Sequence, residues 1–345
     1  MRSIVCLLLP VAAYAAACTS TTSCTEWVML GGGPARSFIY TTYPLDAPND
    51  HIRRALVMVH GAGRDADNYF RTAVAAAFLA GALDDTVVIA PRFASNEGRG
   101  CADKLDGNEV NWPCGGDSWR SGGVSSSNHN LTSYDFADEI LRKLARKSVF
   151  PNLQTIVVAG HSAGGQFVTR YEMANKVHDT LGVKIDYVVS NPSSYAYPDA
   201  QRPAGEIQVP APSATPTEAP RPVRFGPFRD SRNCTTYDQW PYGMKSRTGY
   251  TADIPDDQLK KQLAGRATTY LLGELDILPL GGFDSSCPAM AQGPTRLARG
   301  RAFVEYLTTK YAARDHKAVV IPLCGHNARC MFTAEAALPI LFPKE

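Results

Sequence analysis

Apolar positions along the chain recur with two alternating periods. Short aliphatic and β-branched runs, typical of buried strands, are separated by longer stretches in which apolar residues recur at helical spacing. The expected strands are residues 26–30, 37–43, 55–61, 85–91, 155–159, 184–191, 267–276 and 317–323. The expected helices are residues 67–80, 133–147 (with Ser133 as N-cap), 166–177 and 295–311, and a closing helix from about residue 328. This alternation predicts an α/β fold whose mainly parallel central sheet is flanked by helices on both faces.

The alternation breaks between residues 192 and 265, where a proline-rich stretch interrupts it. Residues 203–227 contain seven prolines and little apolar periodicity. Because proline cannot donate a ladder hydrogen bond, such a segment is a poor source of strands for the sheet. We therefore expect a single domain over residues 18–345, with a proline-rich insertion or lid around residues 195–265.

The N-terminus has the pattern of a secretory signal peptide. Arg2 supplies a positive charge, residues 4–17 are mainly apolar, and small residues precede Cys18. We therefore expect a signal peptide over residues 1–17 and a secreted, extracellular mature protein. The competing interpretation is a bacterial lipoprotein anchored through Cys18. No later apolar run reaches the length of a membrane span, so we expect no transmembrane segment.

The cysteines favour disulfides over metal binding. Of the nine in the chain, loss of Cys6 with the signal peptide would leave eight. An even count in an exported protein favours disulfides, and no C-x-x-C pair points to a metal site. Cys324 and Cys330 are close enough in sequence to pair with each other, and Cys287 is the alternative partner for either.

The net charge of the chain bears on which binding partners we expect. A formal net charge of +2 gives no reason to expect nucleic acid or an anionic membrane as a partner. We expect a monomer that acts on a small or polymeric substrate.

One motif supplies candidate chemistry. Gly160-His161-Ser162-Ala163-Gly164 has the spacing G-x-S-x-G and lies between an expected strand and an expected helix. That context is the one in which a sharp turn projects a nucleophilic serine above a sheet. The alternative is an ordinary glycine-rich turn between a strand and a helix.

A serine hydroxyl needs a base, and the base needs an orienting group. His326 follows the last expected strand, and Asp276 ends the strand before it. We take His326 as the base and Asp276 as the acid, with Glu274 and Asp199 as alternative acids. The carboxyl ends of parallel strands share one edge of a sheet, so these residues are expected to meet there.

The order Ser162, Asp276, His326 resembles that of the α/β-hydrolase superfamily. Residues 59–63, Val-His-Gly-Ala-Gly, resemble the His-Gly loop of that family. The resemblance implies that the backbone N–H groups of Ala62 and Ala163 form the oxyanion hole, and that no metal or organic cofactor takes part. The Ser162 segment also resembles those of secreted esterases, feruloyl-esterase-like enzymes and polyester depolymerases.

The resemblance implies a secreted serine hydrolase that cleaves carboxylic esters through an acyl-enzyme. A secreted serine peptidase of the same fold and a non-catalytic binding protein are the alternatives. Aromatic residues of the loops are expected either to line the substrate cleft or to anchor the loops to the core: Trp112, Trp119, Tyr195, Tyr197 and Trp240.

Overall fold

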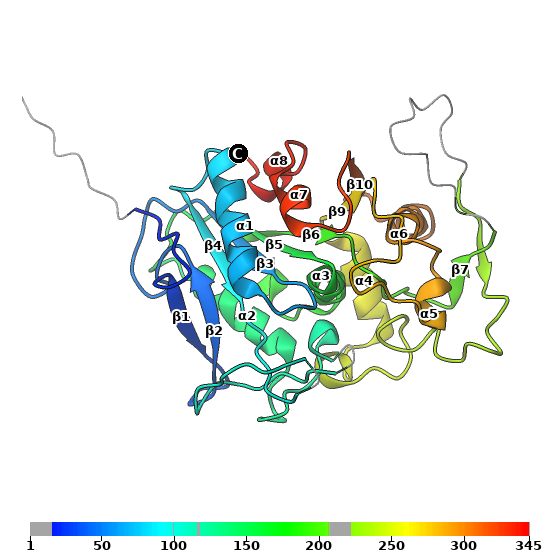
Figure 1. Cartoon of the computed structure of the whole chain (residues 1–345), viewed down its shortest axis with the longest axis horizontal. Coiled ribbons are helices and arrows are strands. Elements are labelled where there is room, and N and C mark those ends of the chain that lie inside the picture. The colour runs from blue at the N-terminus through cyan, green and yellow to red at the C-terminus, as the bar shows by residue number, and fades with distance from the viewer. Residues whose placement is uncertain (1–15, 99, 116–117, 206, 208–221, 345) are drawn as a thin grey trace, which may run out of the picture.

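The computed structural model of the chain describes residues 16–98, 100–115, 118–205, 207 and 222–344. Its centre is an 8-stranded sheet of strand order β1-β2-β4-β3-β5-β6-β9-β10 (Figure 1). β1 and β2 pair antiparallel, β2 pairs antiparallel with β4, and all further neighbours pair parallel. The strands are Thr25–Met29 (β1), Arg36–Thr41 (β2), Arg54–Val59 (β3), Thr86–Pro91 (β4), Thr155–His161 (β5), Lys184–Ser190 (β6), Thr268–Gly273 (β9) and His316–Ile321 (β10).

Helices cover both faces of this sheet, because successive strand side chains point to opposite faces. In β3, Val57 and Val59 pack into one core, and Leu56 and Met58 pack into the other. The first core receives α2 (Ser133–Leu144), α3 (Ala163–Ala174), α4 (Asp256–Gly265) and α6 (Arg296–Lys310). The second receives α1 (Ala66–Leu79), α7 (Ala328–Thr333) and α8 (Leu338–Leu341), while α5 (Cys287–Met290) belongs to the loop after β9. The predicted α/β fold is therefore confirmed.

Every expected strand and helix is present, with differences at the ends, and the structure adds short elements and one longer helix that were not expected. Thr132, not Ser133, caps α2, because its side chain accepts from the backbone N–H of Asp135 while the Asp135 carboxylate accepts from the backbone N–H of Thr132. The helix α4 was not expected. It buries only Leu259 and Leu263, which is too little apolar periodicity to stand out in the sequence.

The proline-rich region contributes no strand to the central sheet in its described part. Two three-residue strands, β7 (Gln201–Pro203) and β8 (Phe225–Pro227), instead pair with each other as a separate antiparallel ladder. This agrees with the expectation that the stretch is a poor source of strands for the central sheet, although the pairing of its two ends was not expected. Residues 206 and 208–221 of the expected insertion lie outside the described residues.

Four disulfides join the eight cysteines: Cys18–Cys24, Cys101–Cys114, Cys234–Cys287 and Cys324–Cys330. The local Cys324–Cys330 pair is thus confirmed, and Cys287 pairs elsewhere. Most of the expected signal peptide, residues 1–15, lies outside the described residues. Within the part of the chain that the structure describes, no helix has both the length and the apolar character needed to cross a membrane.

Candidate active site

The turn between β5 and α3 holds Ser162 in a strained conformation. Ser162 has φ 58° and ψ −117°, a region that non-glycine residues rarely adopt. The glycines on either side allow three backbone segments to approach closely. A Cβ on Gly160 would lie 2.3 Å from the carbonyl oxygen of Gly164, and one on Gly164 would lie 2.2 Å from the carbonyl oxygen of Val59. The G-x-S-x-G spacing is therefore required by this backbone geometry.

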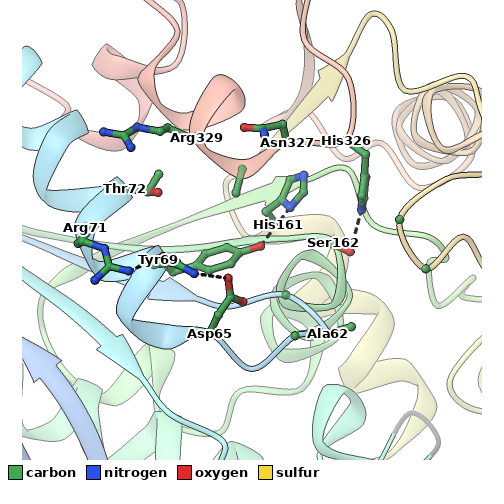
Figure 2. Close-up of a pocket in the computed structure, with 16 residues that line it drawn as sticks. Ala62, Asp65, Tyr69, Arg71, Thr72, His161, Ser162, His326, Asn327 and Arg329 are labelled. Atoms are coloured by element: carbon green, nitrogen blue, oxygen red, sulfur yellow. Dashed lines mark hydrogen bonds between the residues drawn. The ribbon is translucent and has the colours of Figure 1, made fainter. Parts of the chain in front are cut away.

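Ser162, His326 and Asp276 form a hydrogen-bonded row. The Nε2 atom of His326 is 2.9 Å from the Ser162 hydroxyl oxygen, and its Nδ1 atom is 2.8 Å from Oδ2 of Asp276 (Figure 2 shows the serine contact). Asp276 is buried, at 2% exposure, whereas the His326 side chain retains 12%. A carboxylate at Nδ1 fixes the tautomer in which Nδ1 carries the proton and Nε2 faces the serine.

The buried acid has a second charged partner. Nη1 of Arg296, at the start of α6, lies 3.2 Å from Oδ1 of Asp276. The Arg296 side chain is completely buried and also donates to the Ser193 hydroxyl and to the carbonyl of Gly281. Both Asp276 oxygens thus have a partner, which a buried carboxylate requires.

The loop after β3 lies beside Ser162 and is held by His60. Nδ1 of His60 donates to the carbonyl of Gly61 at 2.8 Å, and Nε2 accepts from the backbone N–H of Phe93 at 3.1 Å. Burial lowers the pKa of His60 to about 4, so the ring is neutral near pH 7. His60 therefore orients the loop that carries Ala62 and does not act as a base.

His161 lies against the ring of His326, with 4.6 Å between ring centroids. Its Nδ1 atom is 3.2 Å from the Tyr69 hydroxyl, as Figure 2 also shows. Burial, then the nearby His326 and Arg296, lower the pKa of His161 well below its usual value. A neutral ring thus supports one side of His326.

The two alternative acids lie elsewhere. The Glu274 carboxylate accepts from the backbone N–H of Leu323 at 2.8 Å and so anchors the segment that leads to His326. Asp199 accepts from the hydroxyls of Tyr306 and Tyr311, each at 2.6 Å. Of the three carboxylates considered from the sequence, the structure brings Asp276 to the histidine.

A pocket of about 700 Å³ opens over this row. Helix α1 supplies one wall, through Tyr69, Arg71 and Thr72, and α7 supplies another, through Arg329 (Figure 2). Among the described residues that line it, none is Val, Leu, Ile, Met or Phe. The pocket is therefore lined by small and polar side chains, without a large aliphatic one.

The expected substrate-binding aromatics do not line this pocket, which corrects the sequence-based expectation. Four are at most 2% exposed and belong to the core: Trp112, Trp119, Tyr195 and Tyr197. Trp240 is partly buried, and its indole N–H donates to the carbonyl of Ser121 at 3.0 Å. These rings anchor loops to the core, because burying large aromatic area is strongly favourable.

No group of three or more His, Cys, Asp or Glu side chains within the described ranges could hold a metal ion.

The family model described as "Alpha/beta hydrolase family" matches residues 56–338. The chain belongs to the alpha/beta hydrolase family. The match spans the segments that carry Ala62, Ser162, Asp276 and His326, and the resemblance seen in the sequence is confirmed. No curated protein matches the chain.

Solved structures of the same fold are similar over nearly the whole chain. One is poly(aspartic acid) hydrolase-1 from Sphingomonas sp. KT-1, with a TM-score of 0.61 and 19% identity, covering 92% of this chain and 98% of that chain. Another is LpqC, a poly(3-hydroxybutyrate) depolymerase from Bordetella parapertussis, with a TM-score of 0.58 and 21% identity, covering 89% of this chain and 88% of that chain. At these identities the likeness establishes the fold.

Sequence reasoning missed three site residues of this alpha/beta hydrolase family member. Arg296 starts a helix and carries no motif, and Tyr69 lies in the first turn of α1 without one. Asn191, at φ 44°, joins β9 to the histidine loop, because it accepts from the Gly273 N–H at 2.8 Å and donates to the Gly325 carbonyl at 3.2 Å. Only Asn191, the last residue of an expected strand, carried a signal that could have marked it.

Proposed function

We propose that the protein is a secreted serine hydrolase that cleaves carboxylic esters through an acyl-enzyme intermediate. The observation that carries this proposal is the row from Ser162 through His326 to Asp276, with contacts of 2.9 and 2.8 Å. A strained serine at the end of a central strand, bonded to a histidine that a buried carboxylate orients, has the geometry of an activated nucleophile.

In the first half-reaction, Oγ of Ser162 attacks the ester carbonyl carbon while Nε2 of His326 takes the hydroxyl proton. The Nδ1–H of His326 donates to Asp276, which stabilises the resulting imidazolium. As the tetrahedral intermediate collapses, the bond to the alcohol oxygen breaks. Nε2 passes its proton to that oxygen, and the acyl group stays on Ser162.

The negative charge on the carbonyl oxygen requires donors that are in place beforehand. Ala163 is the first residue of α3, where backbone N–H groups have no partner within the helix. Ala62 lines the same pocket on the loop after β3. We propose the backbone N–H groups of Ala62 and Ala163 as the oxyanion hole. Each such donor typically contributes about 3–4 kcal/mol to the transition state.

In the second half-reaction, water replaces the alcohol. His326 takes a proton from the water, whose oxygen attacks the acyl carbon. The bond to Ser162 then breaks, and the proton returns to Oγ. No metal or organic cofactor is needed in either half.

Charged side chains in the pocket, and the lack of large aliphatic ones, favour short or polar substrate groups over long alkyl chains. A long chain placed against Arg71 or Arg329 would remove water from a charged side chain without replacing its hydrogen bonds. The two similar structures are named for hydrolysis of polymers, so a polymeric ester belongs among the substrates to test.

The disulfides support secretion, because such bonds persist in oxidising compartments. Cys18 is the residue on which the lipoprotein alternative depends, and its sulfur is bonded to Cys24. A sulfur in a disulfide is not available for a thioether to lipid. This pairing supports a secreted protein over one anchored through Cys18.

The test compares the wild type with Ser162→Ala on p-nitrophenyl acetate, a polymeric ester and a peptide p-nitroanilide. We expect ester turnover by the wild type, a loss of several orders of magnitude in the variant, and little cleavage of the anilide. A fluorophosphonate should label the wild type and leave the variant unlabelled. A tenth of wild-type turnover in Ser162→Ala would refute the nucleophile, and efficient anilide cleavage would indicate a peptidase.

A further inference from the structure

Arg296 is a fully buried cation in contact with the proposed catalytic acid. Its side chain is 0% exposed, and Nη1 lies 3.2 Å from Oδ1 of Asp276. The other oxygen of Asp276, Oδ2, bonds His326. The arginine, the carboxylate and the imidazole therefore form one continuous row that ends at Ser162.

All three guanidinium nitrogens donate, and each reaches a different segment. Nε donates to the Ser193 hydroxyl after β6 at 2.7 Å, and Nη2 donates to the carbonyl of Gly281 in the loop after β9 at 2.9 Å. The planar guanidinium fixes these directions relative to one another, which a lysine cannot do. Arg296 thus holds two segments at fixed positions around Asp276.

One of these segments packs on the proposed base. Gly281 has φ 57°, and a Cβ built on it would lie 3.0 Å from Cδ2 of His326. The Gly281 backbone therefore touches the imidazole, and the hydrogen bond from Arg296 fixes that backbone. His161 supports the same ring, with 4.6 Å between the two ring centroids.

Burying a cation is costly unless it is paired and hydrogen-bonded. Desolvation lowers the pKa of Arg296, and the Asp276 carboxylate opposes that change. An apolar residue would be sufficient for packing α6 against the core. We therefore look for a role of Arg296 that depends on its charge.

We propose that Arg296 is a positioning residue for the acid–base pair of Asp276 and His326, an inference that rests on the proposed serine-hydrolase function. It fixes the orientation of the Asp276 carboxylate through one nitrogen, and it holds the Gly281 backbone close to His326 through another. It does not touch the substrate.

The positive charge of Arg296 should also affect how the activity depends on pH. The titratable or charged groups that face the pair are Arg296 from α6, His161 from the end of β5 and, beyond His161, Tyr69 from α1. Arg296 is the cation among them, so it opposes protonation of the pair. Removing it should favour that protonation and move the acid limb of the kcat/KM profile to higher pH.

The experiment uses Arg296→Gln and Arg296→Lys, with Arg299→Gln as the matched control. Arg299 is a buried arginine one turn further along α6. It donates to the carbonyls of Gly293, Asp284 and Ser193, and none of these contacts involves Asp276 or Gly281. Because it shares Ser193 with Arg296, it controls for the loss of a buried arginine that is bonded to that residue. Its loss should lower the melting temperature without acting on the acid–base pair.

For Arg296→Gln we expect kcat to fall about 10²-fold with KM nearly unchanged, since a misplaced catalytic group loses about that much. The acid limb should move to higher pH. Arg296→Lys keeps the charge but not the three contacts, so its acid limb should stay near that of the wild type while kcat recovers only in part. Arg299→Gln should keep the wild-type kcat and acid limb.

The inference is overturned if folded Arg296→Gln retains the kcat and the acid limb of the wild type. If that variant does not fold, Arg296→Lys and Ser193→Ala decide, because an unchanged kcat in both would equally overturn it. A wild type without Ser162-dependent ester turnover would instead refute the proposed function. The two failures are therefore distinguishable.

Discussion

Glu274 and Asp276 are two carboxylates separated by one residue at the end of β9, and the local backbone decides which of them faces His326. The strand ends at Gly273, and the N–H of Asp276 donates to the carbonyl of Gly273 at 3.1 Å, which turns the chain inward. Glu274, before the turn, instead bonds the N–H of Leu323. The proposed acid is therefore specified by a turn and not by residue type.

This difference predicts opposite outcomes for two conservative variants. Asp276→Asn should lower kcat/KM by roughly 10⁴-fold, because an amide neither holds the histidine tautomer nor stabilises the imidazolium. Glu274→Gln, the matched control, should lower it only a few-fold, since the amide oxygen can still accept from Leu323. Steady-state kinetics on p-nitrophenyl acetate would check both. If the losses were exchanged, the proposed acid would have to be Glu274.

The proposed nucleophile, base and acid could be identified from sequence because each has a local marker. Ser162 lies in a spaced motif, and Asp276 and His326 follow recognisable strands. Arg296 could not be identified, because its partners are 20 and 103 residues away and helix-start arginines are common. The role of the loop aromatics stayed open, because a sequence does not distinguish a buried loop ring from one that lines a cleft.

A short disulfide holds the segment that carries His326 between β10 and α7. Cys324 and Cys330 bracket the histidine, and Asn327 caps α7 by accepting from the N–H of Cys330 at 2.9 Å. Cys18–Cys24 closes a loop of the same length, with a separation of 6 in both, but lies outside the pocket. The chain thus offers a matched pair of disulfides, of which one lies beside the site.

Removing each bond should separate the effect on stability from the effect on catalysis. The loop-entropy model gives about 2 kcal/mol for either loop, so both double variants should lose only a few degrees in melting temperature. Cys324→Ser/Cys330→Ser should also lose about 10²-fold in kcat, because the histidine is held less firmly. Cys18→Ser/Cys24→Ser should keep wild-type kcat. Equal kcat in the two variants would show that the local bond is purely structural.

Strands and helices whose apolar residues recur with a strong period could be predicted from the sequence. Elements with a weak apolar pattern could not. β3 and β5 are buried, apolar strands whose extents follow from the sequence. The helix α4, with two buried leucines, did not show enough apolar periodicity, and the pairing of β7 with β8 joins residues 201–203 to 225–227 across a proline-rich stretch. Pairing across such a stretch depends on tertiary contacts that local patterns do not record.

At the scale of the whole molecule, burial of neutral histidines links stability to pH. Desolvation lowers the pKa of His60 and of His316 to about 4, and it lowers the pKa of His161 well below the usual value. The unfolded chain binds protons at these rings near pH 6.5, whereas the folded chain does not until about pH 4. Stability is therefore lost as the pH falls through this window.

Asp138 acts in the opposite direction. Burial raises its pKa to about 6, against hydrogen bonds from the hydroxyls of Tyr171 and Tyr250 at 2.7 Å each. A carboxyl whose folded pKa is raised contributes stability at low pH that is lost as the pH rises through about 6. It offsets part of the histidine effect over the same range.

We therefore expect the free energy of unfolding to fall between pH 7 and pH 5, since burial lowers the pKa of four histidines (His60, His161, His178 and His316) and raises the pKa of three carboxyls (Glu26, Asp138 and Glu172). Each fully buried ring contributes up to about 3 kcal/mol across its window. Urea unfolding at pH 7, 6 and 5, followed by tryptophan fluorescence, would measure the total. The variant His316→Gln should be less stable than the wild type at pH 7, because it loses the contact with the Tyr270 hydroxyl. It should nevertheless show a shallower pH dependence, because the ring that the unfolded state protonates is gone. A slope equal to that of the wild type would mean that His316 does not titrate on unfolding, and the acid sensitivity would then have to come from the other three histidines.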